Sequence, residues 1–377
     1  MSAIPVGFYA PLKSHDHPVP SGDRTMARLF LAALGAGGFA PDVASRLRTF
    51  EPQGDPTRQR DIARASEAEA DRLAHRYRAL PAVERPRLWF TYHSYYKAPD
   101  HLGPLVSERL GIPYAAAEMS RAGKRRNGPW SFAHEAAEFA ADRAAVIFAL
   151  TRHDREALAR LRPDGQRVVD LPPFLDAAPL AAVAARAQAA ETGLARLLAV
   201  GMMRDGDKLA SYRLLATGLD AIAALSWNLT IVGDGPARPE VERLFAPLGA
   251  RVRFAGLATG PDIAGHYREA DCLVWPAVNE AYGMVLLEAQ ASSCPVVAGA
   301  FGGVPDAMRP GETGLMPPPG DAAAFADAVA ALIRDPARRR RMGRAAHDFI
   351  SRERGVDAAA GILRNALLPL LRQSGTP

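Results

Sequence analysis

The sequence predicts an α/β protein with two doubly wound domains in series, for three reasons. The chain has 377 residues, which is too long for one ordinary hydrophobic core and about right for two α/β domains. Short apolar runs alternate with longer amphipathic segments, a pattern typical of β-α-β units with a parallel sheet. A proline pair, Pro172 and Pro173, interrupts this alternation, and the pattern begins again near Leu194. We therefore expect a domain boundary within residues 177–192.

In the first half, each expected strand is a short apolar run that leads into a polar or glycine-containing loop. These runs are residues 4–10, 88–92, 114–117, 145–149 and 167–171. A helix is expected from about Asp23 to Leu34. Ser21 and Asp23 are both candidates for its N-cap, because their side chains accept hydrogen bonds from free backbone N–H groups.

The second half repeats the pattern, with each expected strand followed by a helix-like segment. The strands are residues 194–200, 229–232, 252–254, 272–275 and 295–298. Residues 357–371 form an amphipathic tail, which we interpret as packing against the protein itself. The predicted organisation is a first domain at 1–180, a second at 190–350 and a helical tail at 351–377.

The composition is that of a globular protein in a reducing compartment. Hydrophobic residues make up 48% of the chain and charged residues 23%. Cys272 and Cys294 lie in apolar surroundings and are expected to be buried and reduced. With neither a signal-peptide pattern nor an apolar run of membrane-spanning length, a cytoplasmic location is expected. The net charge of +5 permits anionic partners, including peripheral contact with a membrane, whereas nucleic acid is disfavoured.

The most informative segment runs from Trp275 to residue 298. An expected strand ends at Trp275, a loop carries Glu280, and Gly283 precedes a short helix. Glu288 interrupts an apolar run, so its carboxylate must face solvent or find hydrogen-bond donors such as ribose hydroxyls. The N-terminus of the helix offers free backbone N–H groups to a diphosphate. The alternative is that both glutamates are ordinary surface charges.

This spacing of two glutamates resembles the retaining family-4 glycosyltransferases, of the glycosyl transferases group 1 type. The resemblance continues through Phe301-Gly302-Gly303-Val304-Pro305-Asp306 and Gly311-Glu312-Thr313-Gly314, and it covers residues 197–349 well and the first half loosely. It implies the GT-B fold, with two Rossmann-like domains facing each other across a cleft. It further implies a UDP- or GDP-linked sugar donor. Ala281 stands where the family usually has glycine.

By this resemblance, Glu280 contacts the donor sugar and Glu288 the ribose. The backbone at Tyr282, Gly283 and Met284 would bind the sugar and diphosphate.

The loop after the first strand of the second half supplies candidate cations. The family usually has an arginine directly after the glycine that corresponds to Gly201, and a lysine a few residues later. In this chain Met202 occupies the arginine position, and Lys208 matches the lysine. Arg204 is a candidate substitute for the arginine. Two fixed cations suit a departing diphosphate, whose negative charge grows in the transition state, without a metal. A solvated loop is the alternative. Asp205 and Asp207 also match an acidic metal-binding triplet, which we interpret as a turn.

Further contacts are expected at other strand ends. Gly233 and Gly235 form a turn that the resemblance places near the nucleotide, and Gly22 is the best match for a close approach of the backbone to the donor. His93 and Glu118 are candidate contacts to the sugar or acceptor. Met119 stands where the family commonly has a sugar-binding histidine.

A basic cluster follows that strand, at Arg121, Lys124, Arg125 and Arg126. It suits an anionic acceptor, such as a lipid-linked phosphate, or a membrane surface, with a solvated loop as the default interpretation.

The sequence therefore predicts a metal-independent, retaining hexosyl-type glycosyltransferase that needs no cofactor. The acceptor is a glycan, a lipid-linked molecule or a small molecule. Two alternatives remain open. One is a glycosyltransferase-like subunit that binds nucleotide-sugar without turnover, since Met202 and Met119 replace usually polar residues. The other is a sugar-nucleotide epimerase, which would need paired acid/base residues on both sides of the sugar.

Overall fold

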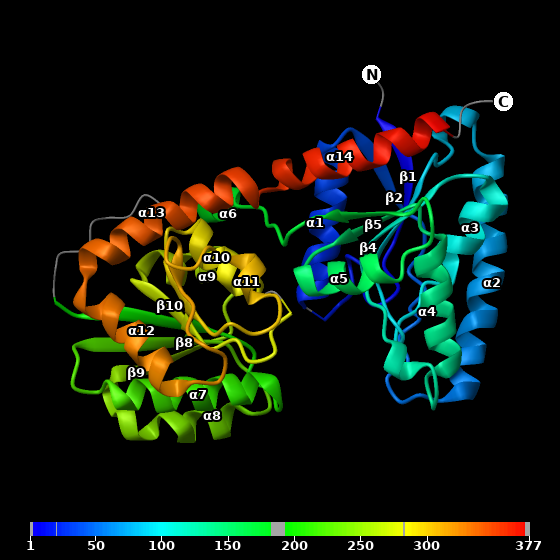
Figure 1. Cartoon of the computed structure of the whole chain (residues 1–377). Coiled ribbons are helices and arrows are strands. Elements are labelled where there is room, and N and C mark those ends of the chain that lie inside the picture. Colours follow the sequence, from blue (N-terminus) through cyan, green and yellow to red (C-terminus); the bar gives the residue numbers. More distant parts are fainter. Residues whose placement is uncertain (1–2, 20, 182–192, 282, 374–377) are drawn as a thin grey trace. The chain divides into compact units, whose positions relative to one another are not determined.

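The computed structural model describes residues 3–19, 21–181, 193–281 and 283–373, which form two compact α/β units (Figure 1). The first unit comprises Met1–Pro172 together with Val356–Pro377, and the second comprises Pro173–Gly355. Each unit contains a six-stranded parallel sheet, as the alternating pattern predicts. The expected second domain began at residue 190, and residues 182–192 lie outside the described part of the chain.

The first sheet has the strand order β2-β1-β3-β4-β5-β6. Its unit consists of β1 (Ile4–Tyr9), α1 (Gly22–Ala36), β2 (Phe39–Val43), α2 (Pro56–Ala79), β3 (Trp89–Ser94), α3 (Leu102–Leu110), β4 (Tyr114–Met119), α4 (Ser131–Arg143), β5 (Val146–Ala149), α5 (Arg152–Arg160), β6 (Arg167–Asp170) and α14 (Val356–Gln373), with 3-10 turns at Ala82–Glu84 and Gly123–Arg125. Ser21 is the N-cap of α1, where its Oγ accepts a hydrogen bond from the backbone N–H of Arg24 at 3.3 Å.

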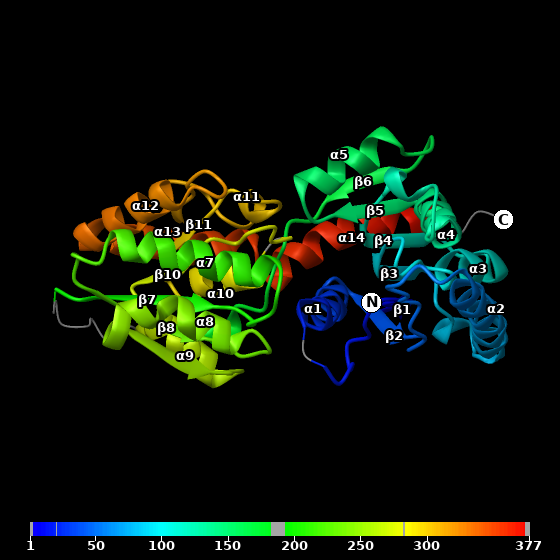
Figure 2. The same cartoon turned by 90° about the horizontal axis from the view of Figure 1, so that it is seen from below.

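The second sheet has the strand order β12-β11-β10-β7-β8-β9 (Figure 2). Its unit consists of α6 (Ala178–Ala181), β7 (Ala195–Val200), α7 (Asp207–Ala221), β8 (Trp227–Val232), α8 (Arg238–Phe245), β9 (Val252–Gly256), α9 (Pro261–Glu269), β10 (Cys272–Trp275), α10 (Met284–Ala291), β11 (Val296–Ala298), α11 (Val304–Ala307), β12 (Gly314–Leu315), α12 (Ala322–Arg334) and α13 (Pro336–Glu353), with a 3-10 segment at Ala246–Arg251.

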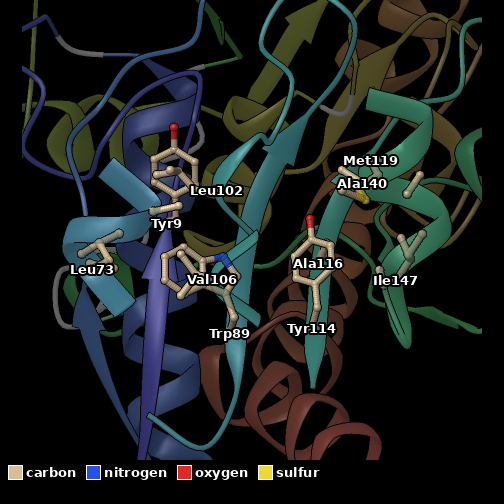
Figure 3. Packing of buried hydrophobic residues seen from close by; sticks show 14 of the residues in the cluster. Tyr9, Leu73, Trp89, Leu102, Val106, Tyr114, Ala116, Met119, Ala140 and Ile147 are labelled. Carbon is tan, nitrogen blue, oxygen red and sulfur yellow. The ribbon is translucent and has the colours of Figure 1, made fainter. Parts of the chain in front are cut away.

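The core of the first unit lies between its sheet and the helices that cover it. Figure 3 shows Tyr9, Trp89 and Tyr114 on neighbouring strands, with Leu73 and Leu102 packed among them. All five side chains are at most 3% exposed. Burial of such aromatic and aliphatic groups contributes about 2 kcal/mol each to the free energy of folding. The stable sheet therefore supports the loops at the ends of its strands.

The tail is part of the first unit, because α14 packs along α1. Leu363 and Leu367 on this helix are completely buried. Arg364 donates a hydrogen bond to the carbonyl of Gly37 at 2.9 Å, and Arg167 donates one to the carbonyl of Ala366 at 3.2 Å. The sequence-based ranges kept residues 351–377 as a separate segment, whereas these contacts join the helix to the first sheet. Across the described ranges, no helix combines the length and apolar character needed to cross a bilayer.

Candidate active site

The loop between β10 and α10 in the second unit has an unusual backbone. Ala277 and Asn279 have φ values of 58° and 48°, and Gly283, the N-cap of α10, has a φ of 57°. Left-handed backbone at residues other than glycine costs about 1–3 kcal/mol and occurs preferentially at functional sites. The bend places Glu280 and the free N–H groups at the start of α10 on the same loop. Met284 is the first residue of α10, and Tyr282 lies outside the described residues.

Two of the three predicted catalytic residues contact each other. Lys208, in the first turn of α7, forms an ion pair with Glu280, and its Nζ also lies 5.5 Å from the centre of the Trp275 ring. The side chains of Lys208 and Glu280 are 22% and 19% exposed, so the pair is largely shielded from solvent screening. Arg204 is exposed on the preceding loop. Sequence reasoning missed Trp275, which in isolation reads as an ordinary core residue.

Hydrogen bonds hold the loop that carries Glu280 against α7. Asn279 donates through its side-chain amide to Asp207 at 2.9 Å, and the backbone N–H of Val278 donates to Ser211 Oγ at 2.9 Å. Asp207 thus has a positioning contact at the start of α7. The site loop is thus fixed to α7 at Asp207 and Ser211, which lie before and after Lys208 in the sequence.

Glu288 lies on α10 with a buried partner that the sequence did not reveal. The hydroxyl of Tyr267, on α9, donates a hydrogen bond to Glu288 Oε2 at 2.7 Å. Burial raises the pKa of the Glu288 carboxyl, although this hydrogen bond opposes the shift. Further hydrogen bonds would stabilise a carboxylate in this position, and ribose hydroxyls can donate such hydrogen bonds.

The predicted glycines of the second unit allow loops to pack closely. Both Gly233 and Gly235 have positive φ values, 143° and 149°. A Cβ on Gly233 would overlap the carbonyl oxygen of Gly201, and one on Gly235 would overlap that of Met203. These glycines therefore bring the loop after β8 against the loop after β7. Gly302 acts similarly, because a Cβ there would lie 2.5 Å from the carbonyl oxygen of Glu280.

In the first unit, the ends of β3 and β4 bring together a largely buried histidine, whose side chain is 19% exposed, and two carboxylates. His93 Nδ1 lies 3.1 Å from Asp23 Oδ1 and 3.7 Å from Glu118 Oε1. His93 and Glu118 both have left-handed backbone, with φ values of 59° and 55°. Sequence reasoning considered Asp23 only as a helix cap; Ser21 fills that role, and Asp23 contacts His93 instead. Among the residues that the structure describes, and apart from its own chain neighbours and helix backbone, none has an atom within 4 Å of the position of a Cβ on Gly22.

The charges in this cluster shift one another's pKa. Burial acts to lower the pKa of His93, but attraction to Glu118, Asp23 and Asp154 outweighs burial and raises it to about 8. Burial raises the pKa of Glu118 against the opposing charge of His93. Burial also acts to raise the pKa of Asp23, yet its hydrogen bond to His93 holds that pKa below the ordinary value. The charged imidazolium is therefore the favoured form of His93 at neutral pH.

We predict that this cluster makes folding stability depend on pH. Because the pKa of His93 is raised from 6.5 to about 8, its stabilising contribution is complete below about pH 6.5 and is lost as pH rises through 8. Wild-type protein is expected to lose about 2 kcal/mol more than a His93→Asn variant between about pH 6 and pH 9, as urea unfolding at each pH would measure. Parallel pH profiles for the two proteins would contradict this assignment.

Comparison with known proteins identifies the family. The family model described as "Glycosyl transferases group 1" matches residues 194–335. D-inositol 3-phosphate glycosyltransferase from Streptomyces bingchenggensis is 30% identical over 321 residues, which are 77% of this chain and 69% of that protein. The chain belongs to the group 1 glycosyltransferase family. The protein of the same name from Streptomyces avermitilis is 32% identical over 295 residues, covering 70% of this chain and 62% of the relative. The alignment thus spans less than two thirds of that relative's length.

This group 1 glycosyltransferase has the GT-B fold, as predicted. The crystal structure of Anabaena Alr3699/HepE in complex with UDP superposes with a TM-score of 0.69 at 14% identity, covering 97% of this chain and 99% of that one. At this identity the likeness concerns the fold. The family model lies within the second unit and includes Lys208, Glu280 and Glu288, so the family match covers the segment that carries the predicted donor site.

Proposed function

We propose that this chain transfers a sugar from a nucleotide-sugar, UDP- or GDP-linked, to a hydroxyl of an acceptor. The observation that carries the proposal is the Lys208–Glu280 ion pair, on the same loop system as the N-terminus of α10. It supplies a cation for a diphosphate and a carboxylate for sugar hydroxyls, and the helix adds free N–H groups. Family membership supports a nucleotide-sugar donor, as does the UDP in the Anabaena structure.

In the proposed reaction, the bond between the anomeric carbon and the diphosphate oxygen breaks, the acceptor oxygen bonds to that carbon, and the proton of the acceptor hydroxyl passes to an oxygen of the departing diphosphate. The bonding electrons leave with the nucleoside diphosphate, which becomes more negative. Lys208, assisted by Arg204, stabilises this charge, so that no metal is needed. Glu280 holds the hydroxyls of the donor sugar. Glu288 Oε1 accepts the ribose hydroxyls while Tyr267 occupies Oε2. Retention of configuration at the anomeric carbon is proposed from the family likeness.

The first unit is proposed to contribute polar contacts to the sugar or acceptor through His93 and Glu118, with Gly22 allowing close approach. Met119, at the position of the usual histidine, is 2% exposed and buried in the core. His93 is the penultimate residue of the neighbouring strand and keeps its charged form at neutral pH, so it can supply an N–H donor in place of the usual histidine. A cytoplasmic location, with peripheral membrane contact for a lipid-linked acceptor, completes the proposal. The buried thiols of Cys272 and Cys294 are consistent with a reducing compartment.

Release of nucleoside diphosphate from a panel of UDP- and GDP-sugars, with and without candidate acceptors, tests this function. Release that requires an acceptor supports transfer. Conversion of the sugar without release would instead support the epimerase alternative. Tight binding of UDP or GDP with neither reaction would support a binding subunit without turnover. The reason for this alternative is Met202, which occupies the usual arginine position and is 38% exposed.

A further inference from the structure

Two cations in the first unit lie over the same pair of aromatic rings. Tyr96, in the loop after β3, meets Trp130 edge-on, with ring centres 5.7 Å apart. Lys97 Nζ lies 5.9 Å from the centre of the Tyr96 ring and 5.3 Å from that of Trp130. The Arg125 guanidinium carbon lies 5.1 Å from each of the two ring centres. We call these four residues the cation–aromatic platform.

Contacts within the protein itself hold Trp130 of the platform in place. The indole N–H of Trp130 donates to the carbonyl of Glu51 at 3.4 Å, and a Cβ on Gly54 would lie 3.2 Å from the indole ring. Loops that follow β2, β3 and β4 therefore meet at Trp130. These are carboxyl ends of neighbouring parallel strands or the loops beyond them, where ligands of open α/β sheets bind.

The positive charge of the platform has no counter-charge within the part of the chain that the structure describes. There, neither Lys97 nor Arg125 has a carboxylate oxygen within 4 Å, and Arg125 Nε is buried without a hydrogen-bond partner. The neighbouring Arg121 differs, because it pairs with Glu138 at 2.6 Å and Asp142 at 2.5 Å. Within the basic cluster of the sequence, Arg121 is thus neutralised, whereas Arg125 shares an unneutralised site with Lys97, which lies outside that cluster.

Aromatic contacts connect the platform to the buried histidine. The ring of Tyr95 lies 5.3 Å from that of His93 and 5.5 Å from that of Tyr96, measured between centres. A small ligand on the platform would therefore extend toward the cluster at the ends of β3 and β4. Half-buried tyrosine and tryptophan rings also offer apolar faces to the C–H groups of a sugar or cyclitol ring.

We propose that Lys97 and Arg125 bind a phosphate group of the acceptor, and that Tyr96 and Trp130 pack against its ring. A phosphate monoester carries close to two negative charges at neutral pH, which match two unneutralised cations better than a single carboxylate does. The N–H groups of Arg125 remain available to phosphate oxygens, since cation–π contact uses only the face of the guanidinium. The assignment of this ligand as the acceptor depends on the proposed function, whereas the phosphate site itself does not.

Titration with inorganic phosphate at constant ionic strength, followed by calorimetry and tryptophan fluorescence, tests the site on the full chain. Trp130 is the suitable reporter, because Trp89, Trp227 and Trp275 are at most 1% exposed. The titration is done in a Lys208→Met background, which weakens any phosphate site on the second unit. Lys97→Met and Arg125→Met are each expected to weaken phosphate binding by about tenfold or more. Lys124→Met, which removes an exposed neighbouring charge, is the matched control and should change it by less than about twofold.

A second comparison uses glucose 6-phosphate and glucose. The phosphorylated sugar is expected to bind about tenfold more tightly or better, and Arg125→Met should abolish the difference. Equal phosphate affinity in all four proteins would overturn the proposal. So would binding of phosphatidylglycerol vesicles through Lys97 and Arg125 without any binding of phosphate, which would identify a membrane surface instead. UDP affinity should be the same in Arg125→Met and wild type, so loss of the phosphate site is distinguishable from failure of the proposed donor site.

Discussion

Replacement of Lys208 with methionine is expected to lower kcat for sugar transfer by about 100- to 1000-fold, with a smaller change in KM for the donor. The ammonium group stabilises charge that appears on the diphosphate mainly in the transition state, and removal of such a fixed charge typically costs about 3–4 kcal/mol of the activation free energy. Its surroundings make it effective, because Lys208 is only 22% exposed and is held by Glu280 and the Trp275 ring. Initial rates of nucleoside diphosphate release measure kcat and KM.

The matched control is Arg204→Met, on the same loop. Its side chain is exposed, so water screens its charge, and less than about a tenfold loss of kcat is expected. The melting temperature of each variant checks that the second unit stays folded. A Lys208→Met enzyme with wild-type kcat would show that Lys208 does not stabilise the leaving group, and a larger loss with Arg204→Met would assign the main role to Arg204.

Replacement of Glu288 with alanine is expected to weaken UDP binding by about 10- to 100-fold. Hydrogen bonds to an ionised group are worth about 1.5–3 kcal/mol, and here they would join a largely desolvated carboxylate to the ribose. Isothermal titration calorimetry with UDP measures this loss directly and needs no acceptor.

Tyr267→Phe provides the control for Glu288, because it removes the hydrogen bond to Oε2 and leaves the carboxylate in place. It is expected to weaken UDP binding by only a few fold, because the Tyr267 hydroxyl contacts the carboxylate and is not itself a proposed contact to the ribose. If the Glu288→Ala protein binds UDP as tightly as wild type, the glutamate is not a nucleotide contact, and the assignment of the donor site to α10 fails with it.

The sequence predicted the central strands of both sheets and the edge strands β6 and β9, but it missed the edge strands β2 and β12. Strands such as β5 and β10 are buried on both faces, so each appears as a continuous apolar run. β2 was not predicted, since it contains Pro41 and Asp42, which are unusual in strands. It lies at the edge of the first sheet, where a proline can be accommodated without breaking a ladder.

The candidate site was predictable residue by residue but not as a set of contacts. Lys208 and Glu280 were each chosen for their chemistry, and only the fold shows that they form an ion pair across 72 positions of sequence. Asp23 is 70 positions from His93, and Tyr267 is 21 positions from Glu288. No local pattern encodes such pairs, because they depend on which strands become neighbours in the sheet.

The position of α14 in the sequence determines when the first unit can finish folding during synthesis. Its leucines complete the core of the first unit, yet residues 356–373 are synthesised after the whole of the second unit. Domains generally fold as they leave the ribosome, the earlier one first. Here translation must pass through residue 355 while α1 still exposes the surface that α14 will cover. The first unit is thus expected to stay partly open until α14 has been synthesised, and chaperones would have their longest access to it during that interval.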